Sequence, residues 1–374
     1  MKIAILSCFY PYRGGIAQFN ANLFEELGKQ NDVRAFNFSR QYPDFLFPGK
    51  TQYVSEQDEA VPVKADALLD TADPFSWGRT ARAIRAWGPD LLLVRYWMSW
   101  FAPSLGTVAR KMAPGCKAVG ILDNVIPHER HWFDAPLTKW FLRGLDGAVT
   151  LCEEVRGDLL ALRPDIPCRV LPHPIYTHFG SKLPREVAEK RLGLPSGRRT
   201  LLFFGLIREY KGLDILLQAF DLLDERYQLV IAGEPYGSFD KYRRLIDGGR
   251  APQDVHVFPE FIRDSEVKYY FSAADLTVLP YRSATQSGVS SVSTHFMVPM
   301  VVTDVGGLKE TIGERGTGIV CDQCTPESVA AAIRHYFDDP DLQIKLREDM
   351  DSEKQRLSWS RFAQDLTAFA GDLQ

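Results

Sequence analysis

Residues 200–223 read TLLFFGLIREYKGLDILLQAFDLL, in which an apolar run, a loop bounded by glycines and an amphipathic repeat follow one another. The run 200–204 has the length and composition of a strand that is buried on both faces of a parallel sheet. From Leu213 onward, apolar residues return with the spacing of one helical face. This succession predicts a β-loop-α unit, from which doubly wound α/β sheets are built.

A similar unit opens the chain. Ile3–Cys8 is an apolar run, Gly14 and Gly15 lie in the following loop, and residues 16–27 repeat with a helical period. Further short apolar runs are expected to form strands at 91–94, 118–122, 148–151, 229–232, 255–258, 276–279 and 300–302. The sequence therefore predicts an α/β protein with two Rossmann-like, doubly wound domains that face each other across a cleft.

The periodicity stops between the two halves, where prolines dominate from residue 172 to residue 184. Such a stretch is typical of a linker, and 374 residues exceed what one hydrophobic core usually supports. We expect an N-terminal domain over residues 1–175 and a C-terminal domain over 176–356. The final stretch has a helical pattern from Trp359 to Leu373.

The composition excludes several classes of protein. A hydrophobic content of 45% and a charged content of 25% are typical of a soluble globular chain, and a net charge of -4 argues against nucleic acid as the main partner. The cysteines are too widely spaced for a disulfide scaffold, and the pair Cys321 and Cys324 has no further zinc ligands near it in the sequence. No apolar run reaches membrane-spanning length and the chain opens with a strand, so we expect a cytoplasmic protein.

Two loops that follow strands carry residues suited to an anion. Gly14 and Gly15 precede a helix, where backbone N–H groups and the helix dipole favour negative charge, although an ordinary tight turn also explains them. Arg208 and Lys211 supply two cations just before another helix, as a diphosphate leaving group requires. A solvated basic loop is the alternative for this second pair.

A third loop ends in Gln286, Ser287 and Gly288, directly before the helical run 289–296. Side-chain donors and a glycine at a helix start suit a second anion contact, whereas simple capping of the helix is the alternative. His128 follows the expected strand 118–122 and should face the same edge of its sheet. Its titration range suits hydrogen bonding to sugar hydroxyls or proton transfer, and a purely structural role is the alternative.

Several motifs together resemble the retaining, nucleotide-sugar-dependent glycosyltransferases of family 4, which have the GT-B fold. The motifs are FYPYRGGIA at 9–17, NVIPHE at 124–129, FGLIREYKGLD at 204–214, AADLTVLPY at 273–281, TQSGV at 285–289 and VPMVVTDVGG at 298–307. They span nearly the whole chain, which makes the set far more specific than any one of them.

The resemblance implies roles for the residues already singled out. Gly14 and Gly15 would face the sugar and the diphosphate, and His128 would contact the transferred sugar. Arg208 and Lys211 would hold the diphosphate. As catalytic groups, the resemblance therefore indicates His128, Arg208 and Lys211. No carboxylate pair is placed as a D-x-D metal clamp after a strand, so we expect no catalytic metal.

The resemblance also implies the partners. The donor is expected to be a UDP- or GDP-sugar, whose base meets the backbone near Phe261 and Ile262, and no cofactor is expected. The acceptor would be a glycan, a glycolipid or a lipid-linked sugar bound by the N-terminal domain, as in the synthesis of cell-surface polysaccharide or glycoconjugates. The last helix, within 357–374, would pack back on that domain.

One departure separates the chain from many members of this family. Two glutamates that they carry with seven residues between them correspond here to Ala284 and Val292, as in a sub-branch that lacks both. Gln286 and Ser287 are the expected substitutes. A catalytically degenerate sugar-nucleotide-binding protein is one alternative. A dinucleotide-dependent oxidoreductase is another, although the G-x-G-x-x-G fingerprint is missing.

The segment 130–143 combines large aromatics with cations. Trp132, Phe133, Trp140 and Phe141 alternate with basic residues, as at a membrane interface. We therefore expect a peripheral contact with the cytoplasmic face of the membrane. The alternative is that these rings fill the core, because their spacing also fits a buried helical stripe.

Overall fold

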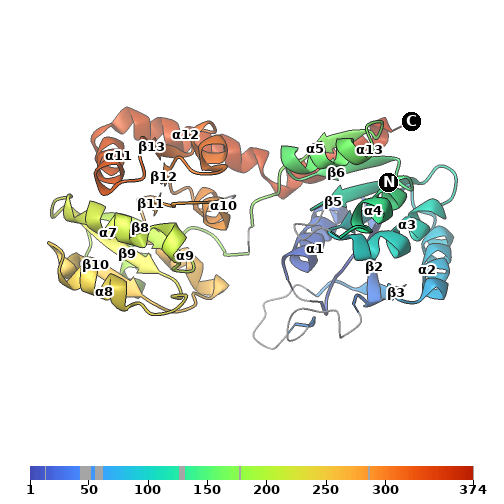
Figure 1. The fold of residues 1–374 in the computed structure, drawn as a ribbon, viewed down its shortest axis with the longest axis horizontal. Coiled ribbons are helices and arrows are strands. Elements are labelled where there is room, and N and C mark those ends of the chain that lie inside the picture. Colours follow the sequence, from blue (N-terminus) through green and yellow to red (C-terminus); the bar gives the residue numbers. More distant parts are fainter. Residues whose placement is uncertain are drawn as a thin grey trace. The chain divides into compact units, whose positions relative to one another are not determined.

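The computed structural model describes residues 1–12, 14–42, 52–54, 62–125, 131–176, 178–284 and 287–373. The chain divides into two compact units, Met1–Pro174 with Leu357–Gln374, and Ile175–Arg356 (Figure 1). The division after residue 174 lies one residue from the boundary expected from the sequence. The first unit is therefore built from two separate stretches of the chain, and the second unit from one.

Among the described residues of the first unit, seven parallel strands form a sheet in the order β3-β2-β1-β4-β5-β6-β7. The strands are β1 (Lys2–Leu6), β2 (Asp32–Arg40), β3 (Ala65–Asp70), β4 (Leu91–Tyr96), β5 (Lys117–Leu122), β6 (Gly147–Thr150) and β7 (Cys168–Val170). The helical segments are α1 (Gly15–Gly28), α2 (Pro74–Trp87), η2 (Ser99–Phe101), α3 (Ala102–Arg110), α4 (Asp134–Leu142), α5 (Glu153–Leu162) and α13 (Trp359–Asp372).

The helices of this unit cover both faces of its sheet. Helices α2 to α5 share one apolar cluster with the sheet, and α1 and α13 share the other. The ring of Phe19 on α1 contacts two rings of α13, with centroids 4.8 Å from Trp359 and 5.6 Å from Phe362. The last helix therefore completes the core of the first unit.

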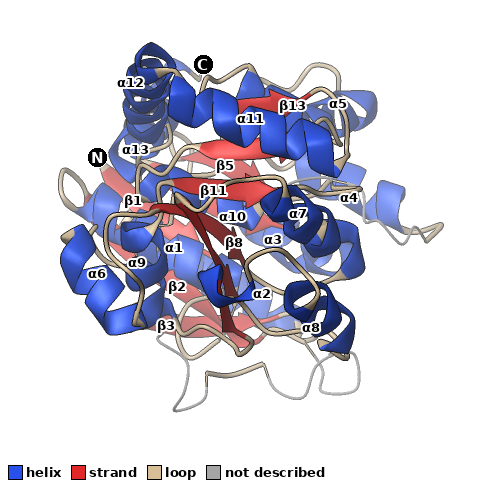
Figure 2. Ribbon diagram, turned by 90° about the vertical axis from the view of Figure 1, so that its left-hand side faces the viewer, coloured by secondary structure: helices blue, strands red, loops and turns tan. Residues whose placement is uncertain are grey.

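The second unit repeats the architecture. Its described residues form a six-stranded parallel sheet in the order β10-β9-β8-β11-β12-β13, flanked by helices (Figure 2). The strands are β8 (Arg199–Phe204), β9 (Tyr227–Ala232), β10 (Val255–Phe258), β11 (Leu276–Leu279), β12 (Met300–Thr303) and β13 (Gly318–Cys321). The helical segments are α6 (Arg185–Leu192), η3 (Glu209–Lys211), α7 (Leu213–Asp221), α8 (Asp240–Asp247), η4 (Pro252–Asp254), α9 (Asp264–Ala273), α10 (Gly288–His295), η5 (Lys309–Gly313), α11 (Pro326–Asp338) and α12 (Pro340–Arg356).

Both sheets have the Rossmann strand order, which confirms the predicted doubly wound α/β class. Every strand expected from the sequence is present, and β2, β3, β7 and β13 are added to them. Because all the strands of a sheet run in the same direction, the loops that follow them gather at one edge. In the described part of the chain, no helix is both long and apolar enough to cross a bilayer.

Candidate functional site

The loop between β8 and α7 is held close to the exit of β11. Gly212 has φ +67°, and a Cβ atom at this position would overlap the carbonyl oxygen of Pro280. Only glycine tolerates both the left-handed conformation and this approach. The sequence Lys-Gly before the helix therefore brings Lys211 against the neighbouring strand exit.

Lys211 is a buried cation. The residue is 8% exposed, and its ammonium lies 5.7 Å from the ring centroid of Tyr281. Burial, reinforced by the positive charge of Arg208, lowers the pKa of Lys211 to about 8. Among the described residues, none forms an ion pair with this ammonium. The buried positive charge of Lys211 is therefore not balanced by a negative charge of the described residues.

Arg208 is the second cation of this loop and is exposed. Its guanidinium lies 4.6 Å from the ring centroid of Tyr236, and no carboxylate of the described residues pairs with it. The other charged side chains nearby are paired, since Asp214 binds Arg282 at 2.8 Å and lies 3.5 Å from Lys241. These two cations, which are unpaired among the described residues, are the pair that the sequence predicts to hold a diphosphate.

The start of α10 lies beside the same loop. A Cβ atom on Gly205 would lie 3.2 Å from Nζ of Lys211 and 3.4 Å from Cγ2 of Val289. At the helix start, the hydroxyl of Ser287 lies 3.3 Å from that of Tyr281 and does not cap the helix, and the space around Gly288 is open. The structure therefore brings Ser287 and Gly288 to the edge where Lys211 lies.

Other predicted site residues of the second unit have different positions. Phe261 and Ile262 follow β10, which lies two strands from β8 at the same edge, and Phe261 is 69% exposed. Gln286 lies outside the described residues. Val292, at the position of one family glutamate, is buried in an apolar cluster against which Ala284 also packs. Apolar side chains therefore pack at both of these positions.

In the first unit, Gly14 and Gly15 form the start of α1. Gly14 has φ +108° with open space around its Cβ position, and the first helical hydrogen bond runs from the N–H of Gln18 to the carbonyl of Gly14 at 3.2 Å. The N–H groups of residues 15–17 therefore have no acceptor within the helix. This arrangement suits an anion or a sugar oxygen.

The exit of β5 is anchored by a residue that sequence reasoning missed. Arg95 on β4 is 3% exposed, binds the carboxylate of Asp123 at 2.7 Å and stacks 3.6 Å from the ring centroid of Phe19. An arginine inside the otherwise apolar run LLLVRY was the available signal. His128, five residues after Asp123, lies outside the described residues, so its role stays a prediction.

The four aromatics of the segment 130–143 behave differently from one another. Phe141 is buried, Phe133 and Trp140 are both 37% exposed, and Trp132 is 89% exposed. The interpretation that all four fill the core is therefore wrong for Trp132. The guanidinium of Arg110 stacks 3.7 Å from the ring centroid of Trp140.

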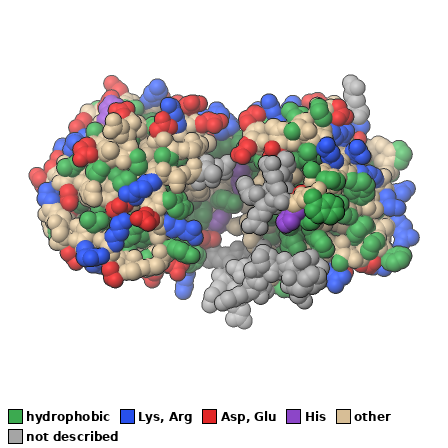
Figure 3. Space-filling view, viewed as in Figure 1, with side chains coloured by type: hydrophobic (Ala, Val, Ile, Leu, Met, Phe, Trp, Pro, Cys, Tyr) green, Lys and Arg blue, Asp and Glu red, His purple; other side chains and the backbone are tan. Residues whose placement is uncertain are grey.

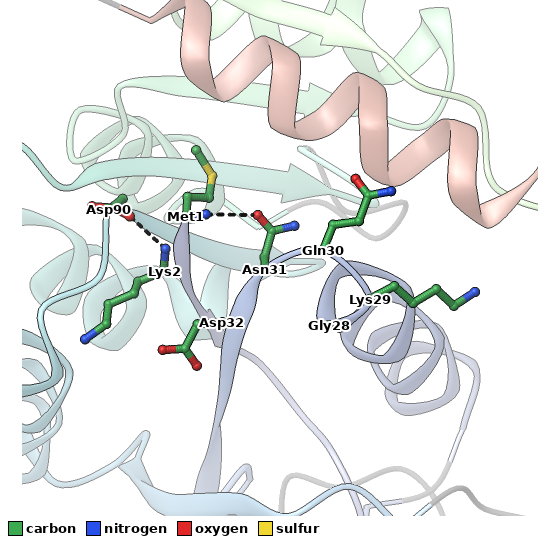
Figure 4. Close-up of a pocket in the computed structure, with 8 residues that line it drawn as sticks. All are labelled: Met1, Lys2, Gly28, Lys29, Gln30, Asn31, Asp32 and Asp90. Carbon is green, nitrogen blue, oxygen red and sulfur yellow. Dashed lines mark hydrogen bonds between the residues drawn. The ribbon is translucent and has the colours of Figure 1, made fainter.

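Two further features lie apart from this chemistry. A polar hollow of about 610 Å³ opens at the amino ends of the strands in the first unit, where the N–H of Lys2 donates to Asp90 at 2.7 Å and the amino terminus to Asn31 at 3.2 Å (Figure 4). Cys321 is buried and Cys324 exposed, both as free thiols. Within the described ranges, no three His, Cys, Asp or Glu side chains gather as a metal site.

Comparison with protein families assigns both units. Residues 14–174 match the glycosyl transferase 4-like domain and residues 184–356 match the glycosyl transferases group 1. The unmatched residues are 1–13, the linker 175–183 and the returning segment 357–374.

Individual relatives of the chain are named as glycosyltransferases. The D-inositol 3-phosphate glycosyltransferase 1 of Catenulispora acidiphila is 28% identical over 313 residues, which cover 77% of this chain and 74% of that protein. The D-inositol 3-phosphate glycosyltransferase of Corynebacterium urealyticum is 26% identical over 195 residues, 50% of this chain and 46% of the relative. The chain thus spans about half the length of several curated relatives that it matches.

Solved structures share the fold. HepE of Anabaena, in complex with UDP, superposes with a TM-score of 0.67 at 13% identity, covering 100% of both chains. Sucrose-phosphate synthase of Thermosynechococcus elongatus gives a TM-score of 0.61 at 18% identity, covering 100% of this chain and 99% of that chain. At these identities the similarity establishes the GT-B fold and nothing further.

Proposed function

The chain belongs, unit by unit, to the group 1 and 4-like glycosyltransferases of GT-B fold, and on that premise we propose that it transfers a sugar from a nucleotide-sugar donor to a glycan, glycolipid or lipid-linked acceptor. One observation carries the proposal: the buried ammonium of Lys211 has no counter-ion among the described residues. A donor diphosphate supplies the missing negative charge. The exposed Arg208, three residues earlier, doubles the positive charge at this edge of the sheet.

The proposed reaction breaks the bond between the anomeric carbon and the diphosphate oxygen. An acceptor hydroxyl forms the new bond on the same face of the sugar, so the anomeric configuration is retained. The proton of this hydroxyl passes to the departing diphosphate. Lys211 and Arg208 stabilise the charge that develops on the leaving group. Ser287 and the N–H groups at the start of α10 orient the donor.

The identity of the donor and the setting of the reaction form part of the same proposal. UDP is favoured as the nucleotide because HepE of Anabaena, which shares the fold, is known in complex with UDP and with UDP-glucose. A GDP-sugar is the second candidate. We propose a cytoplasmic enzyme, peripheral to the membrane, in cell-surface polysaccharide or glycoconjugate synthesis, from the sub-branch in which Gln286 and Ser287 replace the paired glutamates.

Release of nucleotide diphosphate from a panel of UDP-, GDP- and ADP-sugars tests this function. We expect slow hydrolysis of one donor, faster release with acceptor present and the retained anomer in the product. Binding of the nucleotide without release would favour the degenerate binding protein. Reduction of NAD(P) without any release would favour the oxidoreductase.

A further inference from the structure

An apolar pocket of about 890 Å³ opens in the first unit where β2, β3 and β4 end and α4 begins. Its walls include Trp77, Met98, Trp100, Phe133 and Leu137. The volume lies within the range of small-molecule sites, about 300–1,000 Å³. Figure 3 shows apolar side chains gathered on one face of this unit.

The polar atoms of the tryptophans in the walls are already paired with the protein. The indole N–H of Trp100 donates to Oγ1 of Thr71 at 3.1 Å, and that of Trp77 donates to the carbonyl of Asp70 at 2.9 Å. The rings therefore present carbon to the pocket. A ligand would gain little from polar groups directed at these two walls.

The carboxylate in the lining is paired as well. Asp134 is 4% exposed, accepts a hydrogen bond from the hydroxyl of Ser99 and accepts another from the backbone N–H of His131 at 2.6 Å. Since both of its oxygens accept hydrogen bonds, the carboxylate of Asp134 fixes the start of α4 and does not need a cation as a partner. The pocket as a whole favours a hydrocarbon.

The wall formed by α4 continues into a surface of the kind found at lipid interfaces. Trp132 is 89% exposed, and its ring centroid lies 5.6 Å from that of Phe133 in the pocket wall. Further along α4, the half-exposed Trp140 lies between the exposed cations Lys139 and Arg143. Aromatic rings at headgroup depth beside cations are typical of a protein that touches an anionic bilayer. A chain drawn from such a bilayer would meet the pocket at the end of this surface.

We propose that the pocket binds the hydrocarbon chain, acyl or isoprenyl, of a membrane-derived, lipid-linked acceptor. That this lipid is the acceptor rests on the proposed glycosyltransferase function. The pocket lies at the carboxyl edge of the first sheet, where Gly14 and Asp123 also lie. A chain seated there leaves the sugar head of the acceptor at the edge that the start of α1 occupies. The pocket therefore selects acceptors by their lipid and positions their heads.

Titration of the whole protein with n-alkyl glucosides from butyl to octyl, below their critical micelle concentrations, tests the proposal. Trp77 and Trp100 line the pocket, so tryptophan fluorescence reports the binding. Each methylene that enters should strengthen binding by about fourfold. The proposal would be overturned if the affinity did not depend on chain length. It would also be overturned if phenyl glucoside bound more tightly than hexyl glucoside, because the pocket would then select a ring.

A matched pair of variants locates the binding. Ala72 is exposed and lines the pocket, so Ala72→Phe fills it, whereas Ala86 is exposed at the far end of α2 and Ala86→Phe adds the same ring elsewhere. We expect the chain-length dependence to vanish in Ala72→Phe and to persist in Ala86→Phe, with both variants unfolding at the wild-type temperature. An unchanged dependence in Ala72→Phe would overturn the assignment. Chain-length dependence in a protein that releases no nucleotide would leave the hydrocarbon site standing and contradict the glycosyltransferase function alone.

Discussion

The guanidinium of Arg282 donates hydrogen bonds to both carboxylate oxygens of Asp214, at 2.8 and 2.9 Å. The same guanidinium donates to the carbonyl of Glu209 at 2.9 Å, and the backbone N–H of Arg282 donates to the carbonyl of Tyr210 at 2.7 Å. These bonds tie the exit of β11 to η3, the turn that ends in Lys211. Arg282 is therefore a positioning residue for Arg208 and Lys211, the two cations proposed to bind the donor.

Replacement of Arg282 by alanine should loosen this turn. We expect kcat/KM for the donor to fall roughly tenfold, since one bidentate charged hydrogen-bond pair is lost. Steady-state kinetics measures the effect. Arg226→Ala is the matched control, because it removes a similar pair with Asp224 on the surface of the same unit. Equal losses in the two variants would contradict a positioning role.

Removal of either site cation should slow turnover by about 100-fold, the loss typical of one group that stabilises transition-state charge. Arg208→Ala should leave the melting temperature nearly unchanged, because Arg208 is exposed. Lys211→Met should raise it at pH 7, since a buried charge without a partner is replaced by a side chain of similar length. Full activity in either variant would show that the diphosphate lies elsewhere.

Binding of UDP should weaken as the pH rises above about 8, the pKa to which burial lowers Lys211 in the free protein. A bound diphosphate favours the protonated ammonium, so its binding takes up a proton above this pH and the affinity falls up to tenfold per unit. Calorimetry in buffers of different ionisation enthalpy measures both effects. Lys211→Arg keeps the charge and should abolish the pH dependence; an unaltered profile in this variant would assign the titration to another group.

Activity should survive chelation by EDTA, because the proposed charge stabilisation comes from Lys211, Arg208 and backbone N–H groups. Nucleotide release is measured before and after dialysis against EDTA, and again after addition of magnesium or manganese. A loss that is restored by either ion would contradict the proposal that these groups act without a metal.

The outer surface of α4 should bind anionic vesicles in a salt-sensitive manner. Lys139 and Arg143 are exposed there, and charges near an anionic surface contribute attraction that added salt screens. Flotation with neutral and anionic liposomes measures the binding, which we expect only for the anionic ones. Lys139→Glu combined with Arg143→Glu should abolish it, whereas absence of the wild-type protein from both floated fractions would refute the contact.

Most of the strands that the sequence predicted are continuous apolar runs, because burial on both faces of a sheet favours apolar side chains. Strand β2 was missed because Asn37 interrupts it, a polar side chain that is buried and bonded to the backbone of Phe9 and Tyr10. Strands β3 and β7 lie at the sheet edges, where half-exposed residues weaken the pattern. Local sequence cannot reveal partners that only the assembled sheet supplies.

The candidate site was predictable in its residue types and not in its environment. Arg208 and Lys211 stand out in the sequence as a pair, yet one is exposed and the other buried, because the contact of Gly212 with Pro280 joins segments almost seventy residues apart. The apolar pocket was not predicted at all. Its walls come from the exits of separate strands, and no single segment carries its pattern.

The position of helix α13 at the end of the sequence has a consequence for folding during synthesis. Its apolar face, including Phe362 and Leu366, covers α1, yet these residues leave the ribosome only after the whole of 175–356. At about 5–20 residues per second, that interval lasts roughly 10–35 s. During it, the nascent first unit exposes the apolar stripe around Phe19, whereas the second unit is uninterrupted and can close its core as soon as it emerges. The unit that is synthesised first is thus the last to be completed.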